Sequence, residues 1–448
     1  MAGECQIPLS VEMLREELRT LREQGAAEDV LDRIERDVAA LPDGAPHGDL
    51  EVLYRRLEAV EPGPELAKRE PTDLREIRRL RPDGPRRMRL ECSDEALLDR
   101  MLGAWLARAA GCTLGKPVEG WTRQDIRALL EHVGEYPLRR YFPPVGQEWT
   151  GRRYHGWELD CLRGNIRYMA RDDDMDYTLL GLVIMEAHGP GFTTRNVADE
   201  WLNTLPYHRV YTAETVAYRN LVLGIQPPGT ATLRNPYREW IGAQIRADFW
   251  GYAAAGIPEL AAEFAWRDAI LSHTRNGVYG EMWMAATIAA AFAVNDVEQA
   301  IRIGLSEVPA ECRLAQALNE TLAWCNADGD LETTLDRIHA QFGHYHPVHT
   351  INNAALVVAG LMYGRASLGA TICGAVAGGW DTDCNGASAG SVFGAMHGAN
   401  VLPYEWVGCL NDTLHSALSG VNQGKPHRFT DLAQRTLVQH KKVAARLE

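Results

Sequence analysis

The stretch at residues 378–398 reads GGWDTDCNGASAGSVFGAMHG. Its glycines at 386, 390, 394 and 398 recur every four residues, so they would line one face of a helix. Each glycine inside a helix costs roughly 1 kcal/mol relative to alanine. Two explanations for the stripe remain open: close approach of another helix, or close approach of a ligand beside the aspartates at 381 and 383.

Other segments of the chain are also rich in small and apolar residues. Most run for about ten residues or more, which is too long for typical strands, and alternating β-branched runs are scarce. We therefore predict an all-α fold. The expected helical segments are 97–110, 177–187, 260–271, 282–294, 314–324, 354–363 and 386–397.

Residues 1–90 differ from the rest because they are rich in Glu, Arg and Leu and poor in aromatic residues. Apolar residues recur at helical spacing over 11–21, 29–41 and 50–60, and PDGPRR at 82–87 is typical of a linker. We predict a helical N-terminal extension over 1–90 and a catalytic domain over 91–448. A solvated helical bundle without chemistry is the alternative for the extension.

Composition excludes several classes of protein. The 448 residues carry a formal net charge of −14, which argues against general binding to nucleic-acid backbones. The nine cysteines form no CxxC pair, as expected for reduced thiols. The N-terminus lacks the basic region of a signal peptide, and the longest apolar run, 282–294, is too short to span a bilayer. We expect a cytoplasmic protein without a membrane partner.

An acidic cluster precedes the apolar run LLGLVIME. It consists of Asp172, Asp173, Asp174 and Asp176, with Met175 between them. One aspartate is explained as a helix cap. Four crowded carboxylates repel one another and raise each other's pKa values unless a cation neutralises them. Oxygen ligands of this kind suit hard cations such as Mg²⁺ or Ca²⁺.

A second acidic pair, Asp381 and Asp383, opens the glycine-rich segment. Two separate acidic clusters at helix starts would together build a two-metal site that orients a ligand and activates water. A third element is Glu119, which stands two residues after Pro117 in a glycine-rich loop. On its own, Glu119 is an ordinary exposed glutamate.

Taken in order, these motifs resemble the ADP-ribosylglycohydrolase family, which includes the dinitrogenase-reductase-activating glycohydrolases. The family opens with a pattern like GALLGxAxGDALGxPxE, and MLGAWLARAAGCTLGKPVEG at 101–120 is similar and places Glu119 at the family's glutamate. RDDDMDYTLLGL at 171–182 is similar to the family's [ST]DDT motif, with Asp173 and Asp174 on the paired aspartates. GGWDTDCNGASAG at 378–390 is similar to GGDTDT and places Asp381 and Asp383 on the metal-binding aspartates.

The resemblance covers roughly residues 95–400 and implies a compact all-α fold around a centre of two Mg²⁺ ions. It implies hydrolysis of an N-glycosidic bond to a ribosyl group, in an ADP-ribosyl, nucleoside or nucleotide substrate. A water on the metal would attack, with Glu119 as acid/base and Asp174 as a second catalytic residue. The metal ligands expected from this comparison are Asp172, Asp173, Asp174, Asp381 and Asp383.

Three positions depart from the family pattern. Asp172 stands where the family has Ser or Thr, and Met175 and Cys384 stand where it has Thr. A thiol is a poor ligand for a hard cation. The centre is therefore expected to hold its metals in altered geometry, to bind only one, or to prefer Ca²⁺ or Mn²⁺. A catalytically silent ribosyl-ligand-binding or structural protein, or a specialised natural-product or nucleoside pathway enzyme, are the alternative functions.

Three further residues are candidates for substrate binding. His273 lies near a histidine-bearing segment of the family, although a capping or core histidine is the alternative. Arg246 lies in a segment loosely similar to the family's GNGAAMR, where it would meet a phosphate or a buried carboxylate. Trp380 adds an aromatic ring beside the acidic pair.

The segment around residue 350 supplies two more candidates. We expect His349 or Asn353 to contact the substrate. His344, His346 and His349 also form a weaker candidate for a zinc site.

Overall fold

The computed structural model of the protein describes residues 9–42 and 44–446. These residues form 22 α-helices, and none of the described residues forms a β-strand. The predicted all-α class is therefore confirmed. The N-terminal helices are α1 (Val11–Glu23), α2 (Glu28–Ala39), α3 (His47–Glu58), α4 (Pro64–Arg69) and α5 (Leu74–Leu80). The others are α6 (Asp94–Gly115), α7 (Arg123–His132), α8 (Asp173–His188), α9 (Thr194–Thr204), α10 (Thr212–Val222), α11 (Gly229–Thr232), α12 (Ala247–Ala253), α13 (Pro258–Ala269), α14 (Arg275–Ala291), α15 (Val297–Leu305), α16 (Arg313–Ala327), α17 (Leu331–Phe342), α18 (Thr350–Gly364), α19 (Leu368–Ala377), α20 (Thr382–His397), α21 (Tyr404–Val407) and α22 (Phe429–Ala445).

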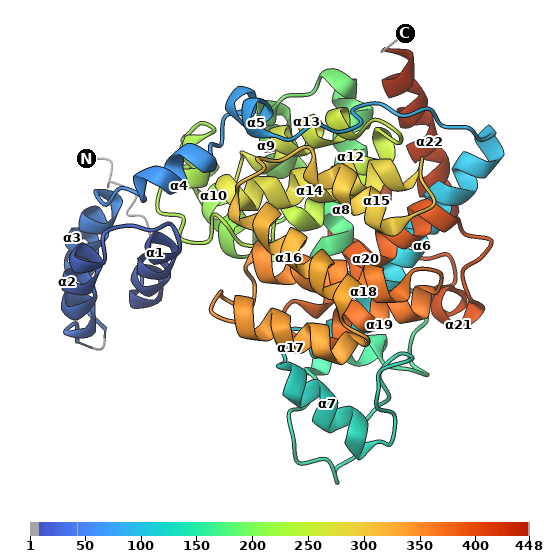
Figure 1. Ribbon diagram of the computed structural model, residues 1–448, viewed down its shortest axis with the longest axis horizontal. Coiled ribbons are helices and arrows are strands. Elements are labelled where there is room, and N and C mark those ends of the chain that lie inside the picture. Colours follow the sequence, from blue (N-terminus) through green and yellow to red (C-terminus); the bar gives the residue numbers. More distant parts are fainter. Residues whose placement is uncertain (1–8, 43, 447–448) are drawn as a thin grey trace.

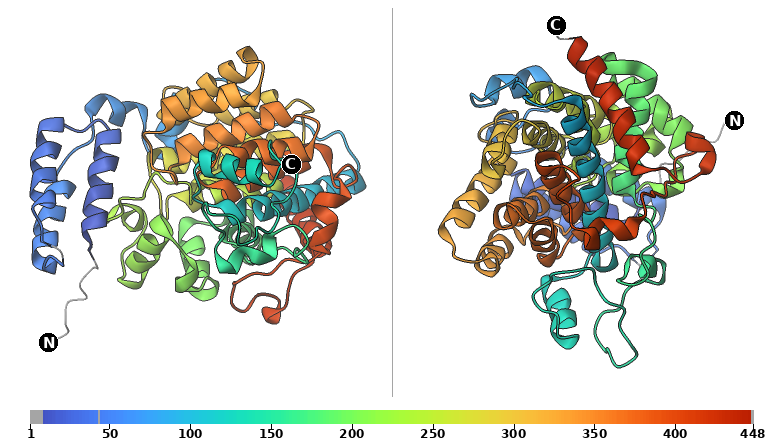
Figure 2. Two further views of the ribbon diagram at one scale, coloured as in Figure 1. Left: turned by 90° about the horizontal axis from the view of Figure 1, so that it is seen from below. Right: turned by 90° about the vertical axis from the view of Figure 1, so that its right-hand side faces the viewer.

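The first three helices project from one side of the main body (Figures 1 and 2). They match the three periodic segments of the sequence, and they bury a hydrophobic core of their own that includes Leu14, Leu31 and Leu57. Helices α4 and α5 were not expected, because six and seven residues are too few to show a helical period. Ile77 of α5 already belongs to the main core. The first eight residues of the predicted extension lie outside the described residues.

Helices α6 and α20 pack at the centre of the main body with almost no side chains between them (Figure 1). A Cβ atom added to Gly111 would lie 1.9 Å from the carbonyl oxygen of Gly386, and one added to Gly390 would lie 2.1 Å from that of Ala107. Gly394 meets the backbone of Gly103 in the same way. The glycine stripe is therefore explained by close approach of another helix.

This close contact places the end of α6 beside the start of α20. The Thr382 hydroxyl donates a 2.8 Å hydrogen bond to the Gly115 carbonyl. Arg108, in the middle of α6, donates a 2.9 Å hydrogen bond to the Asp174 carbonyl at the start of α8. Three helix ends that are remote in sequence thus meet at one place.

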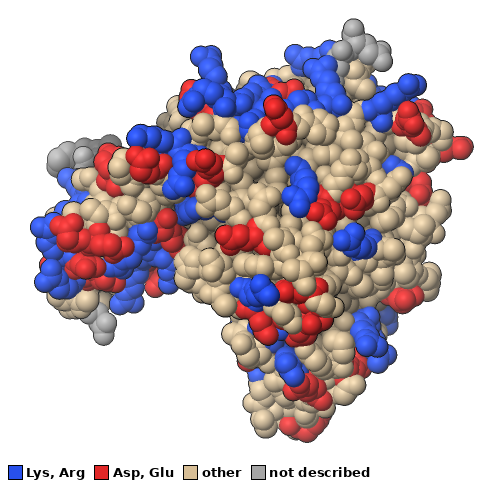
Figure 3. Space-filling view, in the orientation of Figure 1, with Lys and Arg blue, Asp and Glu red and all other residues tan. Residues whose placement is uncertain are grey.

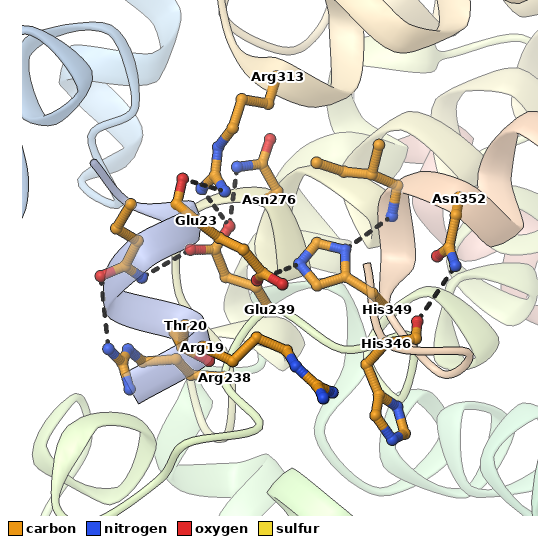
Figure 4. Close-up of polar contacts among 12 residues, drawn as sticks. Arg19, Thr20, Glu23, Arg238, Glu239, Asn276, Arg313, His346, His349 and Asn352 are labelled. Atoms are coloured by element: carbon orange, nitrogen blue, oxygen red, sulfur yellow. Dashed lines mark hydrogen bonds and ion pairs between the residues drawn. The ribbon is translucent and has the colours of Figure 1, made fainter. Parts of the chain in front are cut away.

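The joint between α1 and the main body is polar and buried (Figure 4). Glu239 lies at its centre, where Gln24 Nε2 donates to its Oε1 at 2.7 Å. Asn276 and Arg313 donate to its other oxygen at 2.8 and 2.7 Å. The Thr20 hydroxyl donates to the Pro236 carbonyl at 2.8 Å. Buried polar groups satisfied in this way fix one docking geometry.

Charges of both signs are interleaved over the extension and over the adjoining face of the main body (Figure 3). None of the described helices has the length and apolarity needed to cross a membrane.

A candidate metal centre where three helices meet

A pocket of about 920 Å³ opens where α6 ends and where α8 and α20 begin. Residues 209–214, where α10 begins, and residues 241–245 form two further walls. All six acidic residues predicted from the sequence motifs line this pocket: Glu119, Asp172, Asp173, Asp174, Asp381 and Asp383.

Asp172 caps the N-terminus of α8 and is 1% exposed. One of its oxygens accepts a 3.1 Å hydrogen bond from the Asp174 backbone N–H. The other contacts the ammonium group of Lys116, which follows the last residue of α6. Burial is the largest single influence and would raise the pKa of Asp172. The charge and hydrogen bond of Lys116, the charge of Arg171 and the Asp174 backbone N–H together outweigh it and hold that pKa below its ordinary value.

Asp174 is held by the protein on both oxygens. Arg108 lies 3.1 Å from Oδ1 and also pairs with Asp248 at 2.9 Å. The Cys384 thiol donates to Oδ2 at 3.2 Å. Burial raises the pKa of Asp174 well above its ordinary value, and Arg108 only partly offsets this. These contacts favour an anchoring role for Asp174 over the catalytic role predicted for it.

Asp381 and Asp383 have the opposite surroundings. They are 6% and 4% exposed, and the Oδ1 atom of each is buried without a hydrogen-bond partner. Burial and the neighbouring Asp172 raise the pKa of Asp383 to about 6. Burial and Asp383 raise the pKa of Asp381 well above its ordinary value. Because a buried oxygen without a partner is costly, these two oxygens are candidate ligands for a cation.

Glu119 and Asp173 complete the ring of carboxylates on the open side of the pocket. Glu119 follows the short helix η1 (Lys116–Val118), and the residue as a whole is exposed. The pKa of its carboxyl group is raised well above the ordinary value. The negative charge of Asp383 is the largest cause, and the loss of water around the carboxyl group is the second. Burial and Asp172 raise the pKa of Asp173 to about 8, against the opposing charge of Arg171.

Two overlapping sets of side chains have ligand atoms that all lie within 4.8 Å of one another. The first set, which we call the α8 group, consists of Cys112, Asp172, Asp174 and Asp383. The second, the α20 group, consists of Asp381, Asp383 and Cys384. Carboxylate oxygens suit a hard divalent cation, whereas the thiols contribute little. The partnerless oxygens of Asp381 and Asp383 therefore fit a divalent metal.

Trp380 and Asn353 lie behind the pocket wall and shape it. The Trp380 ring packs against His339 at 4.2 Å. Its backbone N–H donates to Trp121 and its carbonyl accepts from Gly120, so it fixes the loop that carries Glu119. Asn353 Oδ1 accepts a 3.2 Å hydrogen bond from the Asp381 backbone N–H. Neither side chain lines the pocket that was predicted to hold their ligand.

Arg246 and His273 also lie outside the lining of this pocket. Arg246 is 2% exposed and is ion-paired to Glu214 at 2.6 Å and to Asp268 at 2.7 Å. Of the two predicted partners, it meets buried carboxylates and not a phosphate, because its guanidinium group is already saturated. His273 is fully buried and shares a 2.8 Å hydrogen bond with the Ser272 hydroxyl, which matches the alternative of a core histidine.

His349 faces the N-terminal extension and not the pocket (Figure 4). Its Nδ1 accepts from the Ile351 backbone N–H at 3.2 Å, and its Nε2 lies 3.6 Å from a carboxylate oxygen of Glu23. The His346 ring stacks on the Trp240 ring, with 4.0 Å between the ring centroids, and does not share a site with His349. Among the described residues, the three histidines form no group that would hold a metal.

Two cations of the centre were not assigned from the sequence. Arg108 is the one charged residue within the small-residue stretch MLGAWLARAAG, and a lone buried charge of that kind signals a buried partner. Lys116 stands inside the motif that carries Glu119.

Two rings at the pocket mouth were also not predicted. Tyr168 packs against His415, with 4.3 Å between the ring centroids, and no local pattern connects these two distant residues.

Comparison with known proteins shows the family to which the chain belongs. The family model described as ADP-ribosylglycohydrolase matches residues 93–443. A solved structure entitled "ADP-ribosylglycohydrolase-related protein complex" is similar, with 19% sequence identity and a TM-score of 0.46, over 78% of this chain and 99% of that chain. The search of curated proteins gave no match. Because the family model spans most of the sequence, the chain belongs to the ADP-ribosylglycohydrolase family.

Proposed function

We propose that this protein is a divalent-metal-dependent glycohydrolase that cleaves the N-glycosidic bond of a ribosyl substrate. Membership of the family implies glycohydrolase activity on ADP-ribosyl-type substrates. One observation carries the proposal most directly. Glu119, Asp173, Asp381 and Asp383 come from three separate segments and line one pocket, where two buried oxygens have no partner.

Asp381 and Asp383 would hold the cation, with Asp173 and Glu119 beside them. When bound, a divalent metal ion supplies a Lewis acid that orients vicinal ribose hydroxyls and lowers the pKa of water. Mg²⁺ is the proposed ion, with Mn²⁺ and Ca²⁺ as alternatives, because all three accept carboxylate oxygens.

Glu119 is the proposed acid/base residue because it is the one exposed residue among the six motif carboxylates that line the pocket. Hydrolysis forms a bond from the water oxygen to the anomeric carbon and breaks the bond from that carbon to nitrogen. The Glu119 carboxylate would accept the proton of the water and pass it to the departing nitrogen. The raised pKa of Glu119 suits this transfer because it makes the carboxylate a stronger base toward the water proton.

The mouth of the pocket suits an extended anionic substrate. Arg209 lines it together with Tyr211, and Tyr168 and His415 present a pair of rings on another side. A guanidinium group binds phosphate oxygens well, and an aromatic ring can stack on a base. A substrate with a ribose, a diphosphate and a base would use all of these groups.

The direct test incubates the purified protein and MgCl₂ with ADP-ribosyl-arginine, ADP-ribosyl-serine and a panel of nucleosides and nucleotides. We expect release of the free sugar moiety from at least one of them. The Glu119→Gln variant should lose about 100-fold or more of this activity, with an unchanged melting temperature. No release from any substrate would refute the enzymatic proposal, and an equal loss of stability would make Glu119 a structural residue.

The alternative is a silent ribosyl-ligand-binding protein on the same scaffold. Two observations favour it. Asp172 is ion-paired with Lys116, and Met175 and Cys384 stand where the family pattern has hydroxyl residues. ADP-ribose affinity without turnover, unchanged in Glu119→Gln, would support this alternative. Turnover confined to nucleosides would instead favour a specialised pathway enzyme.

A further inference from the structure

Lys116 places a permanent cation inside the metal centre. The chain has only five lysines, and among the described residues only this one lines the pocket. Its side chain is 14% exposed, and its ammonium group contacts the buried carboxylate of Asp172. A lysine ammonium is a compact point charge, so it can stand where a metal ion would otherwise stand.

The α8 group is already neutralised by the protein. Asp172 gives one oxygen to Lys116 and the other to the Asp174 backbone N–H. Asp174 gives one oxygen to Arg108 and the other to the Cys384 thiol. The remaining side chain that is not shared with the second set is the Cys112 thiol, a poor ligand for a hard cation. This group therefore offers little to a second divalent ion.

The α20 group is not neutralised. Asp381 and Asp383 each keep a buried oxygen without a hydrogen-bond partner. Within residues 9–42 and 44–446, no Lys, Arg or His forms an ion pair with either carboxylate, although their side chains are more than nine-tenths buried. These two oxygens point to a ligand that the protein itself does not supply.

We infer that Lys116, together with Arg108, fills the α8 group, so that the centre accepts a single divalent cation, held by Asp381 and Asp383. This inference rests on the metal centre of the proposed function and specifies its stoichiometry. It differs from the two ions that the family resemblance implies. The physical reason is that both groups share Asp383, so a second divalent ion would lie beside the Lys116 ammonium and be repelled by it.

The test is calorimetric titration of the metal-stripped full-length protein with MnCl₂, combined with electron paramagnetic resonance of the loaded sample. We expect the unmodified protein to bind one Mn²⁺ ion and to give an uncoupled spectrum. Lys116→Met frees an Asp172 oxygen and removes the competing charge. We expect this variant to bind two Mn²⁺ ions and to give the signal of a spin-coupled pair.

Two matched variants separate charge from side-chain loss. Lys116→Arg keeps the positive charge and should still bind one ion. Lys441→Met makes the same substitution at an exposed lysine paired with Asp94, and it should also bind one ion. If Lys116→Met does not fold, as judged by circular dichroism, Lys116→Gln replaces it with a polar side chain of similar length.

Each result decides the inference. Two ions on the unmodified protein, or one ion on a folded Lys116→Met or Lys116→Gln variant, would overturn it while leaving metal-dependent hydrolysis intact. No ion on the unmodified protein would overturn both the inference and the metal centre of the proposed function. One ion that becomes two only when the charge at 116 is removed would support it.

Discussion

Asp383 and Asp176 are both buried aspartates in the first turn of a helix that borders the pocket, yet they have opposite surroundings. Asp176 pairs with Arg171 at 2.8 Å and accepts from the Ser416 hydroxyl at 2.6 Å and the Ala417 N–H at 2.9 Å. Asp383 leaves one oxygen without a partner. A carboxylate that the protein has satisfied serves stability, whereas an unsatisfied one is available to a ligand.

We predict that Asp383→Asn weakens Mg²⁺ binding by at least about tenfold, because it removes the charge shared by both ligand groups. Its melting temperature without metal should rise or stay constant, since a buried charge without a partner is lost. Calorimetry and thermal unfolding measure both effects. Asp176→Asn is the matched control, which should lower stability and leave metal affinity unchanged. Equal metal affinity in Asp383→Asn would contradict the assignment.

A second residue-scale prediction concerns Cys384, whose thiol lies in the α20 group. A threonine hydroxyl is a harder ligand than a thiol, so Cys384→Thr should tighten Mg²⁺ binding by about three- to tenfold. Cys373→Thr, in buried surroundings on α19, is the control and should not change it. Identical affinity in both variants would show that the hydroxyl at 384 is not a ligand.

At the scale of helices, the α6–α20 contact has no room for a methyl group. We predict that Gly111→Ala destabilises the protein by about 3 kcal/mol, because its Cβ atom would lie 1.9 Å from a backbone oxygen that cannot move independently of α20. Urea unfolding measures this loss. The variant should also bind Mg²⁺ more weakly, since the same contact aligns the two halves of the centre.

Gly48 provides the control for this substitution. It lies in α3, and a Cβ atom there would meet nothing within 4 Å. Gly48→Ala should therefore keep or raise stability, by up to about 0.5 kcal/mol, through better helix propensity. A similar loss in both variants would mean that glycine flexibility, and not the close helix contact, explains the effect.

At the scale of the whole molecule, the extension docks through a titratable contact. Burial and the charge of Glu239 raise the pKa of Glu23 to about 8, while burial lowers the pKa of the facing His349 to about 3. Near neutral pH both groups are therefore uncharged. The folded protein keeps a proton on Glu23 that the unfolded chain loses near pH 4.5, so this contribution to stability falls as the pH rises through about 8.

We predict that the unmodified protein loses more stability between pH 6.5 and 9 than Glu23→Gln does, by on the order of 2 kcal/mol. Glutamine stays neutral over this range, and other groups that titrate there are common to both proteins and cancel. Melting temperatures at both pH values measure the difference. Glu12→Gln, at an exposed position of the same helix, should behave like the unmodified protein. Parallel pH profiles for Glu23→Gln and the unmodified protein would refute the raised pKa.

Much of the fold could be predicted because it depends on local patterns. The small-residue segments at 97–110 and 386–397 correspond to α6 and α20, and a close helix contact was one of the two explanations left open for the glycine spacing of the second segment. The order and spacing of the three motifs resemble those of a known family, and this resemblance predicted that the six motif carboxylates meet in one pocket, as they do. The predicted boundary at residue 90 stays a prediction, although the separate core of α1–α3 ends before α5.

The substrate residues were harder to predict because side-chain direction is a tertiary property. Trp380 directly precedes Asp381 in the sequence, but its ring packs against His339. Asn353 contacts the Asp381 backbone, so it supports the pocket wall instead of lining the pocket. Arg246 has the chemistry of a phosphate ligand, but Glu214 and Asp268 take its donors. Spacing along a chain identifies which groups approach each other, whereas their remaining partners decide what each group can bind.

The hydrogen bond from Thr382 to Gly115 joins residues that are 267 positions apart. A protein is synthesised from its N-terminus, so α6 leaves the ribosome before the helix that it packs against. The glycine-rich face of α6 therefore lacks its partner on the ribosome until α20, which begins at Thr382, has emerged. A truncated product that ends before residue 382 would carry Glu119 but neither Asp383 nor the helix that covers this face. The candidate metal centre can therefore form only after residue 383 has been synthesised.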